Sequence, residues 1–259
     1  MTRVAGVRVM YVQVSGHAPR FADRVAEMLE RVEHRPAISQ ADREAAYRLR
    51  YEAYLRQNLL NQRLDAMLYD EVYDKSPNSL ISMTYIEGEL ASTVRVHVVT
   101  DEAAVSPALD VFPDVLAPRP RERRVIIDPS RLAARADMAK RFPELPYFAL
   151  RPPWMAAHYF NADFIVVSCA IGHVGYYRRT FRAQAWSDLR SYPKVTAKVV
   201  CVGLEFAVER DGVEARYPSF RSTPAEREAL FGEFSLSLGP CAAARETVPP
   251  RADLQQANA

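Results

Sequence analysis

The sequence predicts an α/β domain with a mixed central sheet and helices on both faces of the sheet. Helical and β-rich segments interleave along the chain, which is the pattern of layered α/β folds. Residues 162–170, ADFIVVSCA, are continuously apolar over the length of one strand, which is typical of a strand buried on both sides. The chain has 259 residues, 49% of them hydrophobic, and can therefore bury a sizeable core.

The N-terminal elements follow from apolar spacing. Residues 7–14, VRVMYVQV, alternate as a strand does, and residues 21–32 place apolar side chains at helical intervals. A short extended piece is expected near 36–39. Ser39 then suits the N-cap position of a helix over 39–57. Its predicted inner face consists of Ala46, Leu49, Ala53 and Tyr54.

The middle of the chain contains the clearest hairpin. Residues 62–79 are polar and predict a loop with a short helical piece. Two β-rich runs within 79–100 flank Glu87-Gly88-Glu89 and predict a hairpin. The segment 101–122 carries four prolines and predicts a long connection. The next strand, 123–128, is predicted to end where the apolar run stops at Asp128.

The C-terminal half repeats the alternation. A helix is predicted over about 145–160, followed by the central strand 162–170 and a helix over 173–184. One or two closing strands are expected over 194–209, and a disordered tail from about 240.

The composition excludes several classes of function. A net charge of +2 is too small for a nucleic-acid binder, and no phosphate-binding glycine loop is visible. The three cysteines show no metal or redox spacing, so we expect no metal and a reducing compartment. No run approaches the roughly 18 apolar residues of a membrane span, and no signal core follows the N-terminus. We therefore expect a soluble, cytoplasmic protein.

Charged residues inside or beside apolar strands are the candidate functional groups. Arg95 lies between two valines of the hairpin and needs an acidic partner or an anionic ligand, since a buried unpaired charge is costly. The partner is predicted among Asp70, Glu71 and Asp74. Asp128 and Arg131 follow the next strand, and one hypothesis is that Asp128 pairs with Arg131 or Arg50 to fix a cleft. These residues form either a structural ion-pair network or the polar wall of a cleft, and the residues alone leave both open.

The order of four segments resembles the acyl-homoserine-lactone (autoinducer) synthases and, more closely, the N-acyl amino acid synthases. The segments are YRLRYEAY (47–54), YDEVYDKSPNS (69–79), GELASTVRVHV (88–98) and IIDPSRLA (126–133), and GHVGYYRRTF (172–181) resembles the part before the last strands. The resemblance covers about 36–205. Both families are branches of the GNAT acyltransferase fold, so it implies a single GNAT-type domain over 36–210. Residues 1–35 and 211–259 would be extensions.

The resemblance implies an enzyme that moves a fatty acyl group from a carrier thioester to an amine. It assigns the conserved polar set to Arg50, Asp74, Arg95, Asp128 and Arg131. Of these, Asp128, Arg131 and Arg95 are predicted as catalytic, and Arg50 and Asp74 as substrate-binding. Asp70, from the same acidic segment as Asp74, and Trp154, a candidate for the apolar acyl tunnel, are also predicted as substrate-binding. Two departures, Asp128 where autoinducer synthases have Glu and Leu59-Leu60-Asn61 where they have a tryptophan, favour an amine other than the homoserine-lactone precursor.

Acyl transfer to an amine needs a base, oxyanion donors and a proton for the leaving thiolate. His173, directly after the central strand, is the candidate base. Tyr177 matches the position at which many GNAT enzymes carry a tyrosine near the leaving sulfur. The alternatives are a helix-end histidine without a chemical role and a tyrosine that only packs. Backbone N–H groups where GNAT strands diverge are the candidate oxyanion donors.

The co-substrate implied is an acyl-phosphopantetheine thioester, either acyl carrier protein or coenzyme A, with no permanently bound cofactor. Carrier proteins are acidic, so arginine clusters are candidate docking residues, although such clusters are also ordinary solvated faces. The candidates are Arg123, Arg124, Arg178, Arg179 and Arg182. Two other functions stay open: an autoinducer synthase that uses S-adenosylmethionine, and a non-catalytic GNAT-fold protein that binds an acyl lipid.

Overall fold

A single twisted sheet organises the molecule. The computed structural model describes residues 21–117 and 124–238. The strands are β1 (Val32–Pro36), β2 (Ser79–Ile86), β3 (Glu89–Val99), β4 (Ile126–Ala134), β5 (Phe164–Cys169), β6 (Gln184–Ala185), β7 (Arg190–Ser191) and β8 (Lys198–Glu205). They pair in the order β1-β2-β3-β4-β5-β8-β6, with β7 also on β8. Neighbours are antiparallel except β4 and β5, which are parallel, so the predicted mixed sheet is confirmed.

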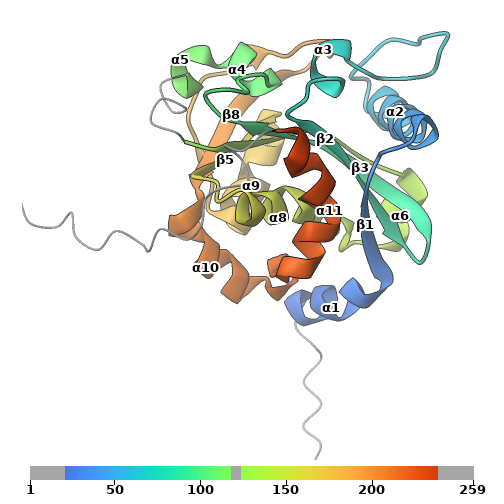
Figure 1. Ribbon diagram of the computed structural model, residues 1–259. Coiled ribbons are helices and arrows are strands. Elements are labelled where there is room, and N and C mark those ends of the chain that lie inside the picture. The colour runs from blue at the N-terminus through green and yellow to red at the C-terminus, as the bar shows by residue number, and fades with distance from the viewer. Residues whose placement is uncertain (1–20, 118–123, 239–259) are drawn as a thin grey trace, which may run out of the picture.

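Helices cover both faces of this sheet, as predicted. They are α1 (Phe21–Met28), α2 (Gln40–Arg56), α3 (Glu71–Asp74), α4 (Pro107–Val111), α5 (Pro113–Leu116), α6 (Ala136–Arg141), α7 (Leu145–Ala149), α8 (Arg151–Tyr159), α9 (Val174–Phe181), α10 (Phe206–Arg216) and α11 (Pro224–Ser237). Short 3₁₀ turns lie at Leu29–Arg31, Ile171–His173 and Pro218–Phe220. In Figure 1, α8 and α11 lie in front of the sheet.

The two faces of the sheet differ in polarity. Leu80 of β2 belongs to the apolar cluster that packs around α8, whereas its neighbour Ile81 packs with residues of α2. Adjacent residues of a strand point to opposite faces, so α2 and α8 cover opposite sides. Beneath α2 the sheet carries buried polar side chains, among them Arg95 and His97. We call these sides the α2 face and the α8 face.

Local sequence rules account for the elements that were predicted well. Ser39 caps α2 in a capping box with Asp42, in which each side chain accepts from the other residue's backbone N–H. The β2–β3 hairpin turns at Glu87 and Gly88, whose φ angles are 54° and 80°. Positive φ at both positions matches the twist of a two-residue hairpin loop, and glycine adopts it without strain.

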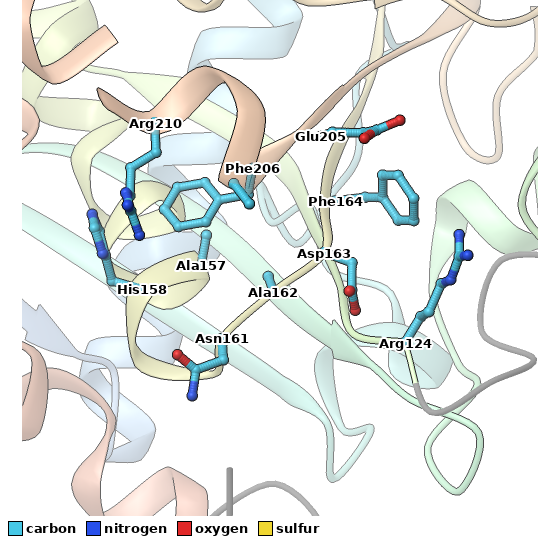
Figure 2. A pocket seen from close by; sticks show the side chains of 11 residues that line it. Arg124, Ala157, His158, Asn161, Ala162, Asp163, Phe164, Glu205, Phe206 and Arg210 are labelled. Carbon is cyan, nitrogen blue, oxygen red and sulfur yellow. The ribbon is translucent and has the colours of Figure 1, made fainter. Parts of the chain in front are cut away.

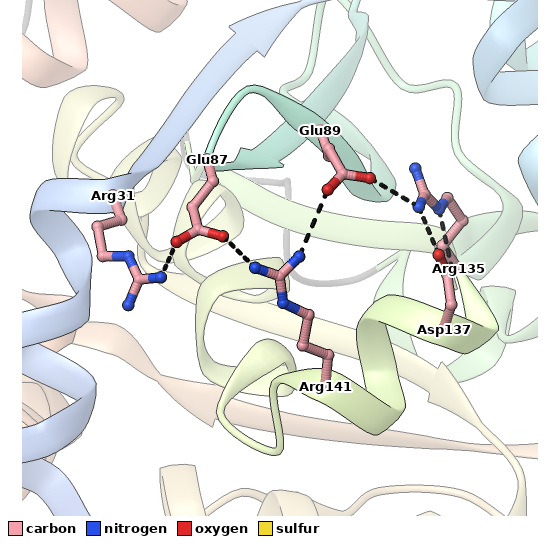
Figure 3. Close-up of polar contacts among 6 residues, drawn as sticks. All are labelled: Arg31, Glu87, Glu89, Arg135, Asp137 and Arg141. Carbon is pink, nitrogen blue, oxygen red and sulfur yellow. Dashed lines mark hydrogen bonds and ion pairs between the residues drawn. The ribbon is translucent and has the colours of Figure 1, made fainter.

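An exposed network of alternating charges holds this hairpin turn to its neighbours. Glu89 contacts Arg135 at 3.0 Å and Arg141 at 3.4 Å, and Arg141 also contacts Glu87. Figure 3 shows the chain of contacts, which comprises Arg31, Glu87, Arg141, Glu89, Arg135 and Asp137. Single exposed pairs contribute little, but a network gains from sharing each charge. It ties the hairpin end to α6 and to the start of β1.

The predicted end of a strand at Asp128 is wrong, because β4 continues to Ala134 through the polar segment. Asp128 pairs in register with His97 and Ser130 with Arg95, so both stay in the ladder with β3. The Nε of Arg95 donates to the Ser130 hydroxyl at 3.0 Å. Pro129 is tolerated because β5 pairs with β4 only at Ile126 and Ile127, which leaves the other side of Pro129 as an edge.

Other predicted boundaries are also wrong, and one of them is the end of the helix 173–184, which stops at Phe181 before β6. The helix over 145–160 is broken at Leu150, because Pro152 and Pro153 can begin a helix but cannot continue one. The closing strand ends at Glu205, and Phe206 begins α10 because Phe206 and Val213 bury one face of a helix. The predicted helix 21–32 stops at Met28, and its last residue begins β1. The expected connection 101–122 contains α4 and α5.

Several predictions lie outside the described residues. These are the strand 7–14, the tail beyond 240 and Arg123. The domain boundaries at 35 and 210 stay predictions.

Candidate active site

The candidate site is a cavity at the point where β4 and β5 diverge. The two parallel strands pair only through Ile126–Phe164 and Ile127–Ile165. Beyond these pairs, residues 129–134 and 167–170 line a cavity of about 400 Å³. The wall is completed by residues of α2 and the loop after it, the α7–α8 junction, the α9 region and the β7–β8 segment. They include Tyr54, Leu59, Leu150, His173, Tyr177, Tyr192 and Val199. The volume suits a small organic group.

The cavity passes between the strands from one face of the sheet to the other. On the α8 face its wall is Leu132, Val167 and Tyr177, which pack with the main apolar cluster. On the α2 face its wall includes Tyr54 of α2 and Tyr192, which packs with the cluster around α4 and α5. One side is therefore apolar and the other is lined by aromatic and charged groups.

Arg131 lies at an irregularity of β4 that turns its side chain into this cavity. Its φ is 52°, and the β3–β4 register shifts between Thr93 and Arg95, opposite this position. Such β-bulges redirect side chains and are common beside active sites. The guanidinium carbon lies 5.8 Å from the ring centre of Tyr54 and 5.4 Å from that of Tyr192. Its Nη2 donates to the Pro193 carbonyl at 3.0 Å.

Tyr177 and Cys169 lie together on the α8-face side of the cavity. Burial, with Cys169 and Tyr54 nearby, raises the pKa of Tyr177, so its hydroxyl stays protonated at neutral pH. Burial also raises the pKa of Cys169 to about 11, so the thiol is protonated and a poor nucleophile. Tyr177 can therefore donate a proton here. His173 lines the same cavity and is exposed to solvent.

Behind the cavity, on the α2 face, lies a buried cluster of two arginines and one aspartate. The Oδ1 atom of Asp74 lies 2.8 Å from Nη1 of Arg50 and 3.1 Å from Nη1 of Arg95, and all three side chains are at most 1% exposed. Burial raises the pKa of Asp74, but the charges of Arg50 and Arg95 and the Asp70 N–H outweigh it and bring the pKa to about 2. The predicted acidic partner of Arg95 is thus Asp74.

Asp128 takes part in neither arrangement. Its predicted pairing with Arg131 or Arg50 is wrong: the carboxylate accepts from the Ala108 N–H at 3.0 Å, and Ser106 also hydrogen-bonds to it. The side chain therefore points to the start of α4 and does not line the cavity. Burial, opposed by these hydrogen bonds and by Arg95, raises its pKa to about 6. A catalytic role for Asp128 stays a prediction.

This raised pKa makes Asp128 a source of pH-dependent stability. The unfolded chain loses this proton near pH 3.8 and the folded protein near pH 6, so the free energy of unfolding falls across that window as pH rises. The shift corresponds to about 3 kcal/mol. Asparagine at position 128 cannot ionise. We therefore expect the free energy of unfolding of Asp128→Asn, minus that of wild type, to rise from pH 4 to 6 and then stay constant. Urea denaturation at four pH values measures this, and a pH-independent difference would contradict it.

The structure separates several residues that the sequence analysis grouped. Trp154 is 1% exposed, donates to Glu214 at 3.0 Å and packs in the core, so it is not in the cavity. Asp70 is buried behind the cavity, where its N–H donates to Asp74. Arg124 stacks on Phe164, the first residue of β5, whereas the cavity reaches the last residue, Cys169.

The remaining docking candidates lie close to the cavity. Arg178 and Arg179 are exposed and follow Tyr177 directly on α9. Arg182 ends that helix and pairs with Glu209 at 3.2 Å. A basic surface therefore stands beside the Tyr177 side of the cavity.

A second cavity of about 480 Å³ lies at the opposite end of β5 (Figure 2). Its wall includes Arg124, His158, Asp163 and Arg210. Asp163 accepts from the Val125 N–H at 2.8 Å and His158 contacts Glu214, so these polar groups already serve the fold. We assign no chemistry to it. In the described part of the chain, no group of His, Cys, Asp or Glu residues could hold a metal ion, and no helix is long and apolar enough to span a membrane.

Two aromatic residues of the cavity were not predicted as site residues. Tyr54 was placed only on the inner face of its helix. Tyr192 lies between β7 and β8, and its burial at 9% exposure depends on contacts made by α4 and α5. In the sequence, Tyr192 is a single tyrosine before a proline, and this pattern does not indicate a site residue.

The comparisons with known proteins agree with this geometry. A family model described as N-acyl amino acid synthase FeeM matches residues 45–205. The solved structure of FeeM, an N-acyl amino acid synthase from uncultured soil microbes, is 16% identical with a TM-score of 0.59, and the alignment covers 70% of this chain and 94% of FeeM. BjaI, a CoA-dependent acyl-homoserine lactone synthase, is 14% identical with a TM-score of 0.53, covering 72% and 89%.

No curated protein matches the chain. The likenesses to solved structures show the shared fold, and the family model confirms the predicted resemblance to N-acyl amino acid synthases. The family model spans well over half of the sequence and includes α2 from Ala45 onward, the buried arginine cluster and both strands of the cavity. The chain belongs to the family of the N-acyl amino acid synthase FeeM, and it is an acyltransferase.

Proposed function

We propose that the protein transfers a fatty acyl group from an acyl carrier protein thioester to the amine of an amino acid or a related small molecule. The observation that carries this proposal is the cavity between β4 and β5, with a protonated tyrosine on one side of the sheet and a buried arginine on the other. A thioester and an amine can meet there from opposite faces.

The reaction is a direct displacement. The amine nitrogen attacks the thioester carbonyl carbon, the new C–N bond forms and the C–S bond breaks. The nitrogen loses one proton to His173 or to water, and the departing thiolate receives one from the Tyr177 hydroxyl. Transfer of the first proton through solvent to the Tyr177 oxygen restores the enzyme. Cys169 does not form an acyl-enzyme, because its thiol is protonated at neutral pH. The products are an amide and the free carrier thiol.

Residues of the cavity can fill the other roles. His173 is the side chain that can accept the proton of the amine, directly or through water. Beyond Ile127 the pairing between β4 and β5 ends, and backbone N–H groups on that edge of β4 are our candidate donors to the oxyanion. Leu132, Leu150 and Val167 form the apolar wall for the first part of the acyl chain.

The donor is tested by comparing the same acyl group on carrier protein and on coenzyme A. We expect the carrier thioester to give the higher kcat/KM at low salt, because Arg178 and Arg179 attract its acidic surface. The advantage should shrink with added salt, since screening lengths fall from about 10 Å at 0.1 M to about 3 Å at 1 M. Equal use of both donors at low salt would contradict a carrier-specific site.

Charge reversal locates the contact. Arg178→Glu with Arg179→Glu should raise KM for the carrier roughly tenfold and leave KM for coenzyme A unchanged. The matched control is Arg24→Glu with Arg48→Glu, which reverses two exposed arginines on α1 and α2. If both double variants raise KM equally, the effect is one of net charge and α9 is not the docking surface.

Mass spectrometry of the product identifies the acceptor class. The alternative, an acyl-homoserine lactone made from S-adenosylmethionine, is disfavoured by Leu59, which lines the cavity within the segment where autoinducer synthases have a tryptophan. Purified enzyme and acyl donor are incubated with a mixture of amino acids in one reaction and with S-adenosylmethionine in another. An N-acyl amino acid supports the proposal, and a lactone product overturns it.

A further inference from the structure

We propose that Arg131 binds a carboxylate of the acceptor and thereby selects amino acids over simple amines. The inference rests on the proposed N-acyl transfer and assigns one group of the cavity to one group of the substrate. It differs from the catalytic role that the resemblance implies for Arg131.

Arg131 is buried, charged and incompletely paired. Arg131 is only 5% exposed, and its Nη1 atom is buried without a hydrogen-bond partner. In the part of the chain that the structure describes, no carboxylate lies within ion-pair distance of it. A buried guanidinium without a counter-ion is costly, and an anionic ligand would remove that cost.

The buried carboxylates near Arg131 are engaged with other groups. Asp74 is shared by Arg50 and Arg95, and Asp128 accepts from the Ala108 N–H. Asp70 lies 3.3 Å from the ammonium group of Lys194. Among the described residues Arg131 therefore lines the cavity without a carboxylate of its own, and an anion in the cavity would be its counter-ion.

The guanidinium of Arg131 is held in one orientation. The rings of Tyr54 and Tyr192 lie near it, and Nη2 is held by the Pro193 carbonyl. Stacked and anchored in this way, the planar group presents its remaining edge in one direction, which is the geometry that carboxylates match. The location on the α2 face also keeps the acceptor away from the apolar wall near Tyr177.

The test compares pairs of acceptors. Each pair consists of an amino acid and the amine of the same structure without the carboxylate. With the wild-type enzyme we expect kcat/KM for the best amino acid to exceed that for its amine by roughly 10²-fold. Arg131→Gln should lower the value for the amino acid, chiefly through KM, and leave that for the amine within a few-fold. Arg131→Lys keeps the charge without the planar edge and should restore only part of the preference.

Arg56→Gln is the matched control, because Arg56 lines the same cavity but is exposed. It should leave the preference unchanged. Equal use of amino acid and amine by the wild type overturns the inference even if Arg131→Gln fails to fold. Parallel loss of both substrates in a folded Arg131→Gln also overturns it. In either case N-acylated products would still support the proposed function, which fails separately if no amine is acylated.

Discussion

Asp74→Asn is expected to lower the free energy of unfolding by about 3–5 kcal/mol, the cost of removing one partner from a buried ion pair. The effect is large because one carboxylate serves both Arg50 and Arg95, and neither guanidinium can reach solvent. Asparagine keeps the size of the side chain, so the change isolates the charge. Urea denaturation at pH 7 measures it, and an unchanged midpoint would mean that another group balances the arginines.

Two controls separate this effect from helix disruption and from general pH sensitivity. Glu71→Gln removes an acid from the same short helix, but Glu71 is exposed and paired with Lys75, so no measurable loss is expected. The stabilisation by Asp74 is present above pH 3.8 and is lost as pH falls through its folded pKa of about 2. As pH falls, the contribution of Asp128 to the free energy of unfolding changes in the opposite direction, because the pKa of that buried acid is raised.

Tyr177→Phe is expected to lower kcat roughly 100-fold, the lower range for loss of a general acid. The thiolate would leave without a proton, while the ring keeps its contact with Phe181 at 6.2 Å between ring centres. A thioester whose thiol is already a good leaving group does not need that proton. Such an activated aryl thioester should therefore react at similar rates with both enzymes. Initial rates with natural and activated donors measure this.

The neighbouring tyrosine provides the control for Tyr177. Tyr176→Phe removes a hydroxyl from the same helix, but Tyr176 does not line the cavity, so kcat should change little. If Tyr177→Phe keeps its rate with the natural donor, the tyrosine only packs, which is the alternative that the sequence left open. A thermal melt of each variant confirms that folding is intact.

The sequence predicted elements whose signals are local. The capping box at Ser39, the two-residue turn at Glu87 and the continuous apolar run of β5 each depend on a few adjacent residues. The strand β4 was cut short because its polar residues look like a surface turn. They are buried only because β3 and α4 supply partners, and those contacts come from distant parts of the chain.

The resemblance groups the candidate residues in one polar set, and the structure divides this set into two. Arg50, Asp74 and Arg95 form a closed cluster beneath α2, whereas Arg131 opens into the cavity. The order of residues in β4 suggested a pair between Asp128 and Arg131. The bulge at Arg131 breaks the simple alternation of side chains, and a backbone angle of this kind has no signature in a non-glycine residue.

The passage between β4 and β5 has a consequence for product release in the proposed reaction. Before transfer, the donor occupies the α8 face and the acceptor the α2 face, so either can bind first and both must be present together. After transfer, one covalent molecule occupies both sides of the sheet. It competes with both substrates and cannot leave by retracing either path alone. The product then leaves through the gap between the diverging strands β4 and β5. Departure of the long-chain amide is therefore the step expected to limit kcat in the proposed reaction.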